Sequence, residues 1–292
     1  MVNTNNFTNF AGAFFQTNPT IQMEKTKVLF ISQEITPYLP ETEMSRTGRY
    51  LPQGIQERGK EIRTFMPRYG SINERRNQLH EVIRLSGMNL IIDDTDRPLI
   101  IKVASIQSAR MQVYFIDNED YFHRKFTLKD ENGEFFADND ERAIFFARGV
   151  LETVKKLRWS PDIVHCHGWF TSLVPLYLKK AYNDDPLFAN SKVVYSIYND
   201  EFDKPLRKDF KDKLKIEGIT NKDIKKIKDT PDFVNLSKLA VDYSDAVIKG
   251  SEKIQPELET YTEEINKPKL DFQPEETYID AYSEFYDELL TK

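Results

Sequence analysis

Short apolar segments that alternate with helical patterns constrain the fold of this chain more than any other feature. Residues 27–32 read KVLFIS, a run of β-branched and aromatic side chains that is typical of a strand buried on both faces. Comparable runs lie at residues 62–66, 99–104, 112–116, 162–165 and 192–197. Because strands that alternate with helices are joined by right-handed crossovers, the pattern predicts an α/β fold, a single Rossmann-like domain with a mainly parallel sheet.

The clearest helical pattern covers residues 140–158. One face of it carries Ile144, Ala147, Leu151, Val154 and Leu157. Asp138, followed three residues later by Glu141, predicts a capping box at its start. A shorter helix is expected over residues 171–182. Residues 81–116 contain strands without a helix between them, which predicts a hairpin or meander beside the parallel sheet.

Composition excludes several classes of protein. The 292 residues include 20 Phe and 14 Tyr, too many for a disordered chain. A single cysteine, Cys166, excludes a disulfide framework and is expected in a reducing compartment, so we predict a cytoplasmic protein. No apolar run approaches the roughly 20 residues that span a bilayer, and no basic residue precedes Lys25, so neither a membrane span nor a signal peptide is expected. The net charge of −6 argues against a general nucleic-acid binder.

The sequence divides into three expected parts. Residues 1–22 carry no charge and no periodic pattern, which predicts a disordered leader and makes Met23 a candidate natural start. Residues 23–250 form the expected α/β domain. Residues 251–292 are an acidic linker and an amphipathic C-terminal helix, in which Tyr278, Tyr282, Phe285 and Leu289 share a stripe that we expect to dock on the domain.

Charge is distributed unevenly in the second half of the chain. Residues 204–228 hold ten Lys or Arg and four Asp or Glu, whereas residues 252–292 hold twelve acids and four bases. Solvated helix faces explain both stretches, and an attraction between them or an interaction role for the basic segment stays open.

Ligands of open parallel sheets bind at the carboxyl ends of strands, so the residues after each strand are the candidate sites. After the first strand, residues 33–48 read QEITPYLPETEMSRTG and have no glycine before Gly48. A phosphate cradle needs glycines, and Glu34, Glu41 and Glu43 would repel a phosphate. The sequence therefore does not favour a nucleotide loop here.

Residues 162–171, DIVHCHGWFT, form the second candidate site. Strand alternation places His165 and His167 on one side of the chain. Metal ligation is not favoured, because no further ligand has suitable spacing, and Cys166 is expected to be a buried apolar residue. His167 with Trp169 is a suitable pair for sugar recognition, since an imidazole hydrogen-bonds hydroxyls and an indole covers a pyranose face. Burial of both histidines among satisfied polar groups is the alternative.

Asp117 and Asn118 follow another strand, and Asp138 begins the clearest helix. Carboxylate and amide side chains are good partners for sugar hydroxyls. They are also common in turns and at helix N-termini, so both interpretations of these three residues stay open.

Five segments carry a resemblance to a known family. They are residues 27–70 (from KVLFISQEITPY to MPRYG), 115–125 (FIDNEDYFHRK), 138–152 (DNDERAIFFARGVLE), 161–180 (PDIVHCHGWFTSLVPLYLKK) and 234–258 (VNLSKLAVDYSDAVIKGSEKIQPEL). In this order they resemble segments of the N-terminal half of glycogen and starch synthases. The resemblance implies the N-terminal domain of a two-domain GT-B glycosyltransferase. Full enzymes of that family transfer glucose from ADP-glucose to an α-1,4-glucan, and their last helix crosses back onto this domain.

The chain departs from the family pattern at important positions. The Lys-Thr-Gly-Gly-Leu loop, which meets the sugar diphosphate, falls on residues 40–44, PETEM. The His-x-His-Asp-Trp-His motif reads HCHGWF at residues 165–170, and the family's next His-Asn reads Tyr195-Ser196. No counterpart of the C-terminal domain, which supplies the charges that stabilise the leaving diphosphate, is expected within these 292 residues.

The resemblance therefore implies a protein linked to α-1,4-glucan synthesis that is catalytically incompetent alone, a pseudoenzyme that binds glucan or a partner. We expect no catalytic residue, cofactor or metal, and a glucan site at His167, Trp169, Asp138, Asp117 and Asn118. Expected partners are an α-glucan or maltooligosaccharide, a second copy of the chain, or a separate protein that supplies the C-terminal half. The alternative is half of a split ADP-glucose-dependent glucosyltransferase, or an active transferase with another donor.

Overall fold

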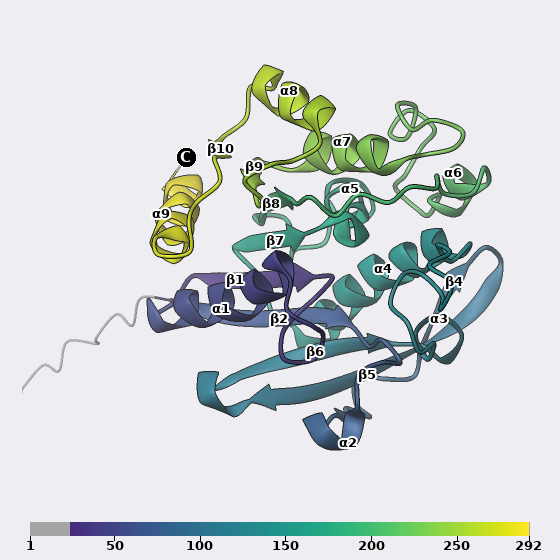
Figure 1. The fold of residues 1–292 in the computed structure, drawn as a ribbon, viewed down its shortest axis with the longest axis horizontal. Coiled ribbons are helices and arrows are strands. Elements are labelled where there is room, and N and C mark those ends of the chain that lie inside the picture. Colours follow the sequence, from purple (N-terminus) through teal and green to yellow (C-terminus); the bar gives the residue numbers. More distant parts are fainter. Residues whose placement is uncertain (1–23, 292) are drawn as a thin grey trace, which may run out of the picture.

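The computed structural model describes residues 24–291 and confirms an α/β fold with a mainly parallel sheet and a docked C-terminal helix (Figure 1). The predictions for residues 1–22 and Met23 lie outside the described residues. Among the helices that are described, none combines the length and apolarity that crossing a bilayer requires.

The strands follow the order β10-β9-β8-β7-β1-β2-β6-β5-β3, and β4 pairs with β5. Their bounds are β1 Lys27–Ser32, β2 Glu61–Pro67, β3 His80–Glu81, β4 Met88–Ile92, β5 Thr95–Ile106, β6 Met111–Asp117, β7 Ile163–His167, β8 Lys192–Ile197, β9 Ala246–Lys249 and β10 Lys269–Leu270. All neighbours from β10 to β6 are parallel. The pairs of β5 with β3, β4 and β6 are antiparallel, as the meander prediction required.

The chain leaves β1 toward β2 and β6 on one side and later returns to place β7 on the other side. The strand order therefore reverses between β1 and β7. In an open parallel sheet this switch point leaves a crevice at the carboxyl ends of the two strands. The residues that follow β1 and β7 are accordingly the first place to look for a ligand site.

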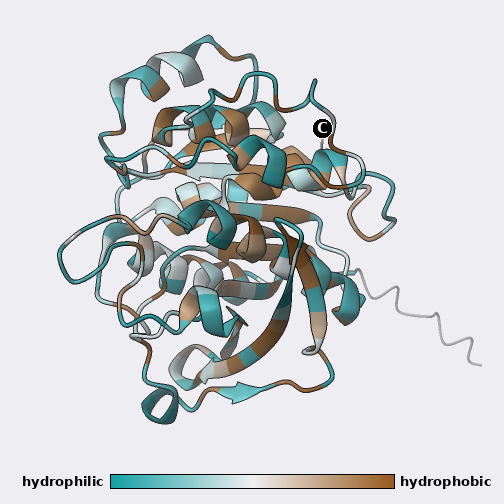
Figure 2. Cartoon of the chain, turned by 90° about the vertical axis from the view of Figure 1, so that its right-hand side faces the viewer, coloured by the Kyte–Doolittle hydropathy of each residue, from teal (hydrophilic) through white to brown (hydrophobic). Residues whose placement is uncertain are grey.

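Helices cover both faces of the sheet. One apolar cluster includes residues of α4 (Asn139–Leu157), α5 (Leu173–Lys180) and α7 (Phe233–Tyr243), and a separate cluster includes α1 (Glu43–Glu57) and α9 (Tyr278–Thr291). Residues of β1 alternate between them: Leu29 and Ile31 join the first cluster, Val28 and Phe30 the second. Figure 2 shows apolar strand and helix segments in the interior and mostly hydrophilic loops outside.

The remaining helices are short connections: α2 Glu74–Asn77, α3 Glu119–Phe122, α6 Phe210–Lys213, α8 Pro256–Glu264, and the 3-10 turns Gln107–Ala109 and Trp169–Thr171. The helix expected over residues 171–182 begins with the second of these turns and continues as α5.

The predicted capping box of α4 is wrong. Asp138 occupies the N-cap position, but its side chain caps no backbone group. Its carboxylate instead accepts a hydrogen bond from Arg124 Nη1 at 2.6 Å. Burial opposes ionisation there, but the Arg124 hydrogen bonds and charge hold the pKa of Asp138 below its ordinary value. The arginine, which lies in the preceding loop, competes successfully with the helix backbone for this carboxylate.

The basic segment 204–228 docks on the N-terminus of α4. Lys213 is buried, and its Nζ lies 3.3 Å from Asp140 Oδ2 and 2.9 Å from Glu141 Oε1. Arg207 Nε lies 3.1 Å from the same Asp140 oxygen. Part of the positive charge of this segment is therefore paired within the molecule. Its partners include the acids of α4, and among the ion pairs of the described residues none joins it to the acidic stretch at residues 252–292.

Candidate functional site

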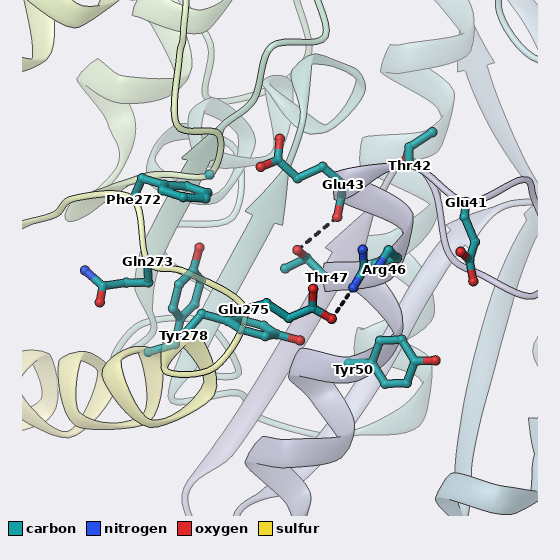
Figure 3. A pocket seen from close by; sticks show the side chains of 12 residues that line it. Glu41, Thr42, Glu43, Arg46, Thr47, Tyr50, Phe272, Gln273, Glu275 and Tyr278 are labelled. Carbon is teal, nitrogen blue, oxygen red and sulfur yellow. Dashed lines mark hydrogen bonds and ion pairs between the residues drawn. The ribbon is translucent and has the colours of Figure 1, made fainter.

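A pocket of about 470 Å³ lies beside the switch point, at the carboxyl edge of the sheet. One wall is the start of α1, and the other is the segment that leads from β10 into α9 (Figure 3). The lining residues are Glu41, Thr42, Glu43, Arg46, Thr47, Tyr50, Gly250, Phe272, Gln273, Glu275, Tyr278 and Tyr282. We refer to this cavity as the α1–α9 pocket.

The N-terminus of α1 is capped by its own side chains. Thr42 Oγ1 accepts a hydrogen bond from the Ser45 amide at 3.0 Å, and Ser45 Oγ accepts one from the Thr42 amide at 2.8 Å. The Thr42 hydroxyl also donates to Glu34 Oε2 at 2.7 Å. Backbone amides at a helix N-terminus can hold an anion, but here two of these donors already have partners.

The charge of the α1–α9 pocket is negative. Glu41, Glu43 and Glu275 line it, and Arg46 is the cation among the described lining residues. Arg46 is ion-paired with Glu275, and this hydrogen bond together with the nearby carboxylates raises the pKa of its guanidinium. Glu43 accepts a hydrogen bond from the Ser251 hydroxyl. The pocket therefore offers hydrogen-bond acceptors and leaves little positive charge for an anion.

A second hollow of about 260 Å³ shares Thr42 and Glu43 with the α1–α9 pocket and extends to Glu34, Tyr198 and Asp200. Asp200 Oδ2 accepts a hydrogen bond from the Trp169 amide at 2.9 Å. Its other oxygen is buried and has no partner within the described part of the chain. Burial raises the pKa of this carboxyl to about 7. The adjoining hollow thus adds a carboxyl group that burial keeps largely protonated below about pH 7.

His165 and His167 lie on one side of β7, as predicted, with ring centroids 3.8 Å apart. His165 Nδ1 lies 2.6 Å from the Tyr286 hydroxyl and its Nε2 2.7 Å from Ser196 Oγ. His167 Nδ1 lies 2.9 Å from the Tyr198 hydroxyl, and its Nε2 has no partner among residues 24–291. Burial lowers the pKa of His167 to about 3 and that of His165 well below its ordinary value. Both rings are buried, and α9 contacts that of His165 through Tyr282 and Tyr286.

Trp169 is also buried, with 1% of its surface exposed. Its ring centroid lies 4.6 Å from that of Phe202 and 5.8 Å from that of Phe135. These aromatic rings occupy the space that a sugar would need for stacking on the indole.

Asp117 and Asn118 lie at the end of β6, outside the α1–α9 pocket. Asp117 is fully buried, with Lys102 Nζ 3.0 Å from its Oδ2. Asn118 caps α3 by accepting from the Tyr121 amide at 3.2 Å and donates to the Pro98 carbonyl at 2.9 Å. The structure therefore does not bring these two residues or Asp138 together with His167 and Trp169 around one cavity.

Glu41 and Glu43 were named from the sequence, but other residues that line the cavity were missed. Tyr50 lies in a helix that was not predicted, and Phe272 and Gln273 lie in a connection without periodicity. Tyr278 and Tyr282 belong to the predicted amphipathic stripe, so their docking was expected but not their place in a pocket wall. Among residues 24–291, no three His, Cys, Asp or Glu side chains are grouped closely enough to hold a metal ion.

Comparison with known proteins gives one family. A model described as the starch synthase catalytic domain matches residues 27–271. The glycogen synthase of Chlorobium limicola is 40% identical over 174 residues, which cover 59% of this chain and 36% of that protein. The glycogen synthase of Chlorobaculum tepidum is 34% identical over 256 residues, which cover 84% of this chain and 49% of that protein. The chain thus spans between a third and a half of the length of these relatives.

A solved structure shares the fold. The catalytic domain of starch synthase IV from Arabidopsis thaliana, bound to ADP and acarbose, matches with a TM-score of 0.64 and 19% sequence identity. The match covers 77% of this chain and 45% of that protein.

Proposed function

This chain belongs to the starch synthase catalytic-domain family, and from that premise we propose that it is a non-catalytic member that binds an α-1,4-glucan in the α1–α9 pocket. The observation that carries this proposal is the acidic, self-capped N-terminus of α1. In the family pattern that we compared above, this is where a lysine and two glycines meet the sugar diphosphate.

Residues 40–44 of this chain have the opposite chemistry. Thr42 supplies the helix cap, and Glu41 and Glu43 place carboxylates beside it. Glycines would let the backbone approach a phosphate closely, and a lysine would neutralise it. With carboxylates in their place, a diphosphate at the same position would be repelled rather than stabilised. Transfer from a sugar nucleotide depends on stabilising that leaving group, so this wall of the pocket does not support the reaction.

The same lining suits a neutral sugar. Carboxylate and amide oxygens accept hydrogen bonds from hydroxyl groups, and aromatic rings cover the apolar side of a pyranose. Glu41, Glu43 and Gln273 provide acceptors, while Tyr50, Phe272 and Tyr278 provide rings. Tyr50 is 44% exposed, which leaves part of its ring accessible to a ligand. The structure of starch synthase IV from Arabidopsis thaliana contains acarbose as well as ADP, and the acarbose agrees with an oligosaccharide ligand for this fold.

Calorimetric titration with maltoheptaose and, separately, with ADP-glucose tests the proposal. We expect the maltooligosaccharide to bind and ADP-glucose not to bind. Micromolar binding of ADP-glucose would overturn the proposal and favour the alternative of a split glucosyltransferase, whose other half a second protein would supply. Absence of binding by maltoheptaose would equally contradict it.

A pair of aromatic variants locates the site. Tyr50→Ala removes an exposed ring from the pocket wall, and we expect it to weaken maltoheptaose binding about tenfold. Phe126→Ala is the matched control, because Phe126 is 40% exposed and does not line the α1–α9 pocket. Equal affinities for the two variants would place the glucan elsewhere on the molecule.

A further inference from the structure

Two exposed isoleucines lie along the outer edge of the sheet, where β3 and β4 pair with β5 (Figure 1). Ile91 belongs to β4, and Ile83 lies in the turn that joins β3 to β4. Their side chains are 59% and 82% exposed, more than any other large apolar side chain among residues 24–291. Neighbouring exposed apolar side chains of this kind mark an interaction surface.

The backbone of β4 also has free hydrogen-bonding groups. Asp93 and Asp94, which join β4 to β5, both have positive φ angles, as in a type I′ turn. Such a turn places Ile92 in a hydrogen-bonded pair with β5, and bonded and non-bonded pairs alternate along an antiparallel ladder. The backbone N–H and C=O groups of Asn89 and Ile91 therefore point away from β5.

Two further observations agree with this direction. Asn89 lies opposite Pro98, which has no N–H to donate. The Ile91 carbonyl accepts a hydrogen bond from Arg148 Nη1 at 2.5 Å rather than from β5. Outside the strand ladder, no hydrogen bond of residues 24–291 uses the amide of Asn89 or Ile91, so both are free donors at the edge.

The opposite edge of the sheet is protected against further pairing, and β4 is not. β10 has two residues, one of them Lys269, and it follows Pro268. A short edge strand, a lysine and a proline are common protections of this kind. β4 has five residues, MNLII, without charge or proline. Its edge is therefore available to another strand.

The charges at the two ends of β4 favour a second copy of the same strand. Arg84 is exposed before the strand, and Asp94 and Asp96 are exposed after it. Within residues 24–291 the ion pairs of this hairpin use Arg97 and Asp93 instead. An antiparallel copy of β4 brings its acidic end to Arg84 and its own arginine to the two aspartates. The pairing is self-complementary, as a twofold interface requires.

We propose that two copies of the chain form a twofold dimer by antiparallel pairing of β4 with β4 of the second copy. The axis passes beside Leu90, so that Asn89 of each copy lies opposite Ile91 of the other. This register satisfies the outward amides of both residues. The Ile91 carbonyl keeps its hydrogen bond from Arg148, because a carbonyl oxygen has two lone pairs.

Sedimentation equilibrium of the full chain at about 10–500 μM tests the dimer, since small interfaces associate weakly. We expect the mass to rise toward twice the 34.3 kDa of the chain. A mass of one chain throughout this range would overturn the proposal and leave the edge to a different partner. A mass that rises beyond two chains would also overturn it, because a twofold pairing is closed.

Two variants assign the dimer to β4. Asn89→Pro removes an outward N–H and leaves the bonds to β5, and Ile91→Lys adds a charge to the edge. Each should raise the dissociation constant of the dimer about tenfold without changing the circular dichroism spectrum. Phe126→Lys is the matched control for Ile91→Lys, because Phe126 is 40% exposed and lies outside this edge. Equal effects of the two lysine variants would place the interface elsewhere and overturn the proposal.

A charge exchange tests the antiparallel orientation. Arg84→Glu places like charges together at both ends of the paired strands and should weaken the dimer severalfold. Addition of Asp96→Arg to this variant restores opposite charges and should recover part of the affinity. A double variant that dimerises no better than Arg84→Glu alone would contradict the proposed register.

Discussion

The two faces of the sheet are built differently. The face under α4, α5 and α7 is apolar along the strands, with Leu29 and Ile31 of β1 packed in a cluster that includes Phe146 of α4. The face under α1 and α9 begins with apolar residues such as Val28 and Ile163. Toward the carboxyl ends of β7 and β8 this face becomes polar. His165 and His167 of β7 and Ser196 of β8 are buried there.

The two faces of the sheet therefore depend on different kinds of interaction for their stability. Along its strands the first face is stabilised mainly by apolar burial, which has no directional requirement. The second face needs specific partners, because buried imidazole and hydroxyl groups must be hydrogen-bonded. Tyr286 of α9 is one such partner, and Tyr278 and Tyr282 of the same helix line the α1–α9 pocket. Helix α9 therefore couples the packing of the second face to the shape of the proposed binding site.

Removal of residues 275–292 should have the largest effect on stability, because it removes helix α9, which packs on the polar face. Four aromatic or aliphatic side chains of α9 are buried: Tyr282, Phe285, Tyr286 and Leu289. At about 1.5–3 kcal/mol for each buried side chain, their loss is comparable with the whole free energy of unfolding of a typical domain. We expect the truncated chain to be insoluble or unfolded by circular dichroism. A truncated chain that keeps its thermal midpoint would show that α9 is dispensable.

Phe146→Ala should cost about 3–5 kcal/mol of unfolding free energy, because its side chain is fully buried on the apolar face. Urea denaturation measures this loss. The folded fraction should bind maltoheptaose with unchanged affinity, since α4 contributes nothing to the lining of the α1–α9 pocket. A weakened affinity in this variant would mean that the two faces are not independent.

The sequence predicted the strands because their periodicity follows directly from the alternation of the two faces. Residues 27–32 and 192–197 were identified at the bounds that the structure shows, and the shared side of His165 and His167 followed from the same period. What covers that side could not be derived in the same way. The hydrogen bond between Tyr286 and His165 joins residues 121 positions apart, and no local pattern encodes such a contact.

Helix α1 was not predicted from the sequence, and the reason lies in its own residues. It contains Gly48 and Pro52, two residues that weaken a helix interior. A Cβ at position 48 would lie 2.6 Å from the Glu34 carbonyl oxygen, so the glycine allows α1 to approach the turn after β1. Tertiary packing thus overrides helix propensity at the segment that forms one wall of the candidate site. The sequence showed the acidity of this segment but not the cavity that it lines.

Tyr286→Phe tests how much one hydroxyl group contributes to the stability of the polar face. The variant keeps the ring and removes the hydroxyl that lies 2.6 Å from His165 Nδ1, leaving that nitrogen buried without this partner. An unsatisfied buried polar group costs about 1–3 kcal/mol, and we expect a loss near the lower end in urea denaturation because the ring stays packed. Tyr50→Phe is the control, since the Tyr50 side chain is exposed and its change should lie within about 0.5 kcal/mol of zero. Equal losses in both variants would remove the special role of the α9 hydroxyl.

The two kinds of titratable group on the polar face respond to pH with opposite signs. The pKa of His165 and of His167 is lower in the folded chain than the unfolded value of about 6.5, so the unfolded chain binds more protons and stability falls as pH drops below about 6.5. Asp200 has a folded pKa of about 7, above the unfolded value of about 4. Its contribution is complete below about pH 4 and is lost as pH rises through 7.

Asp200→Asn should therefore have an effect that changes with pH. Asparagine can still accept the hydrogen bond from the Trp169 amide, but it carries no charge to bury when the pH rises. We expect the variant to be more stable than the parent at pH 8, by at most the roughly 4 kcal/mol that the difference between the folded and unfolded pKa allows, and about equal to it at pH 4, since the parent carboxyl is protonated there in the folded state. Urea denaturation at the two pH values measures the difference. A stabilisation of the same size at both pH values would show that the carboxyl is not desolvated, and that the polar face is held by the α9 contacts rather than by its own protonation state.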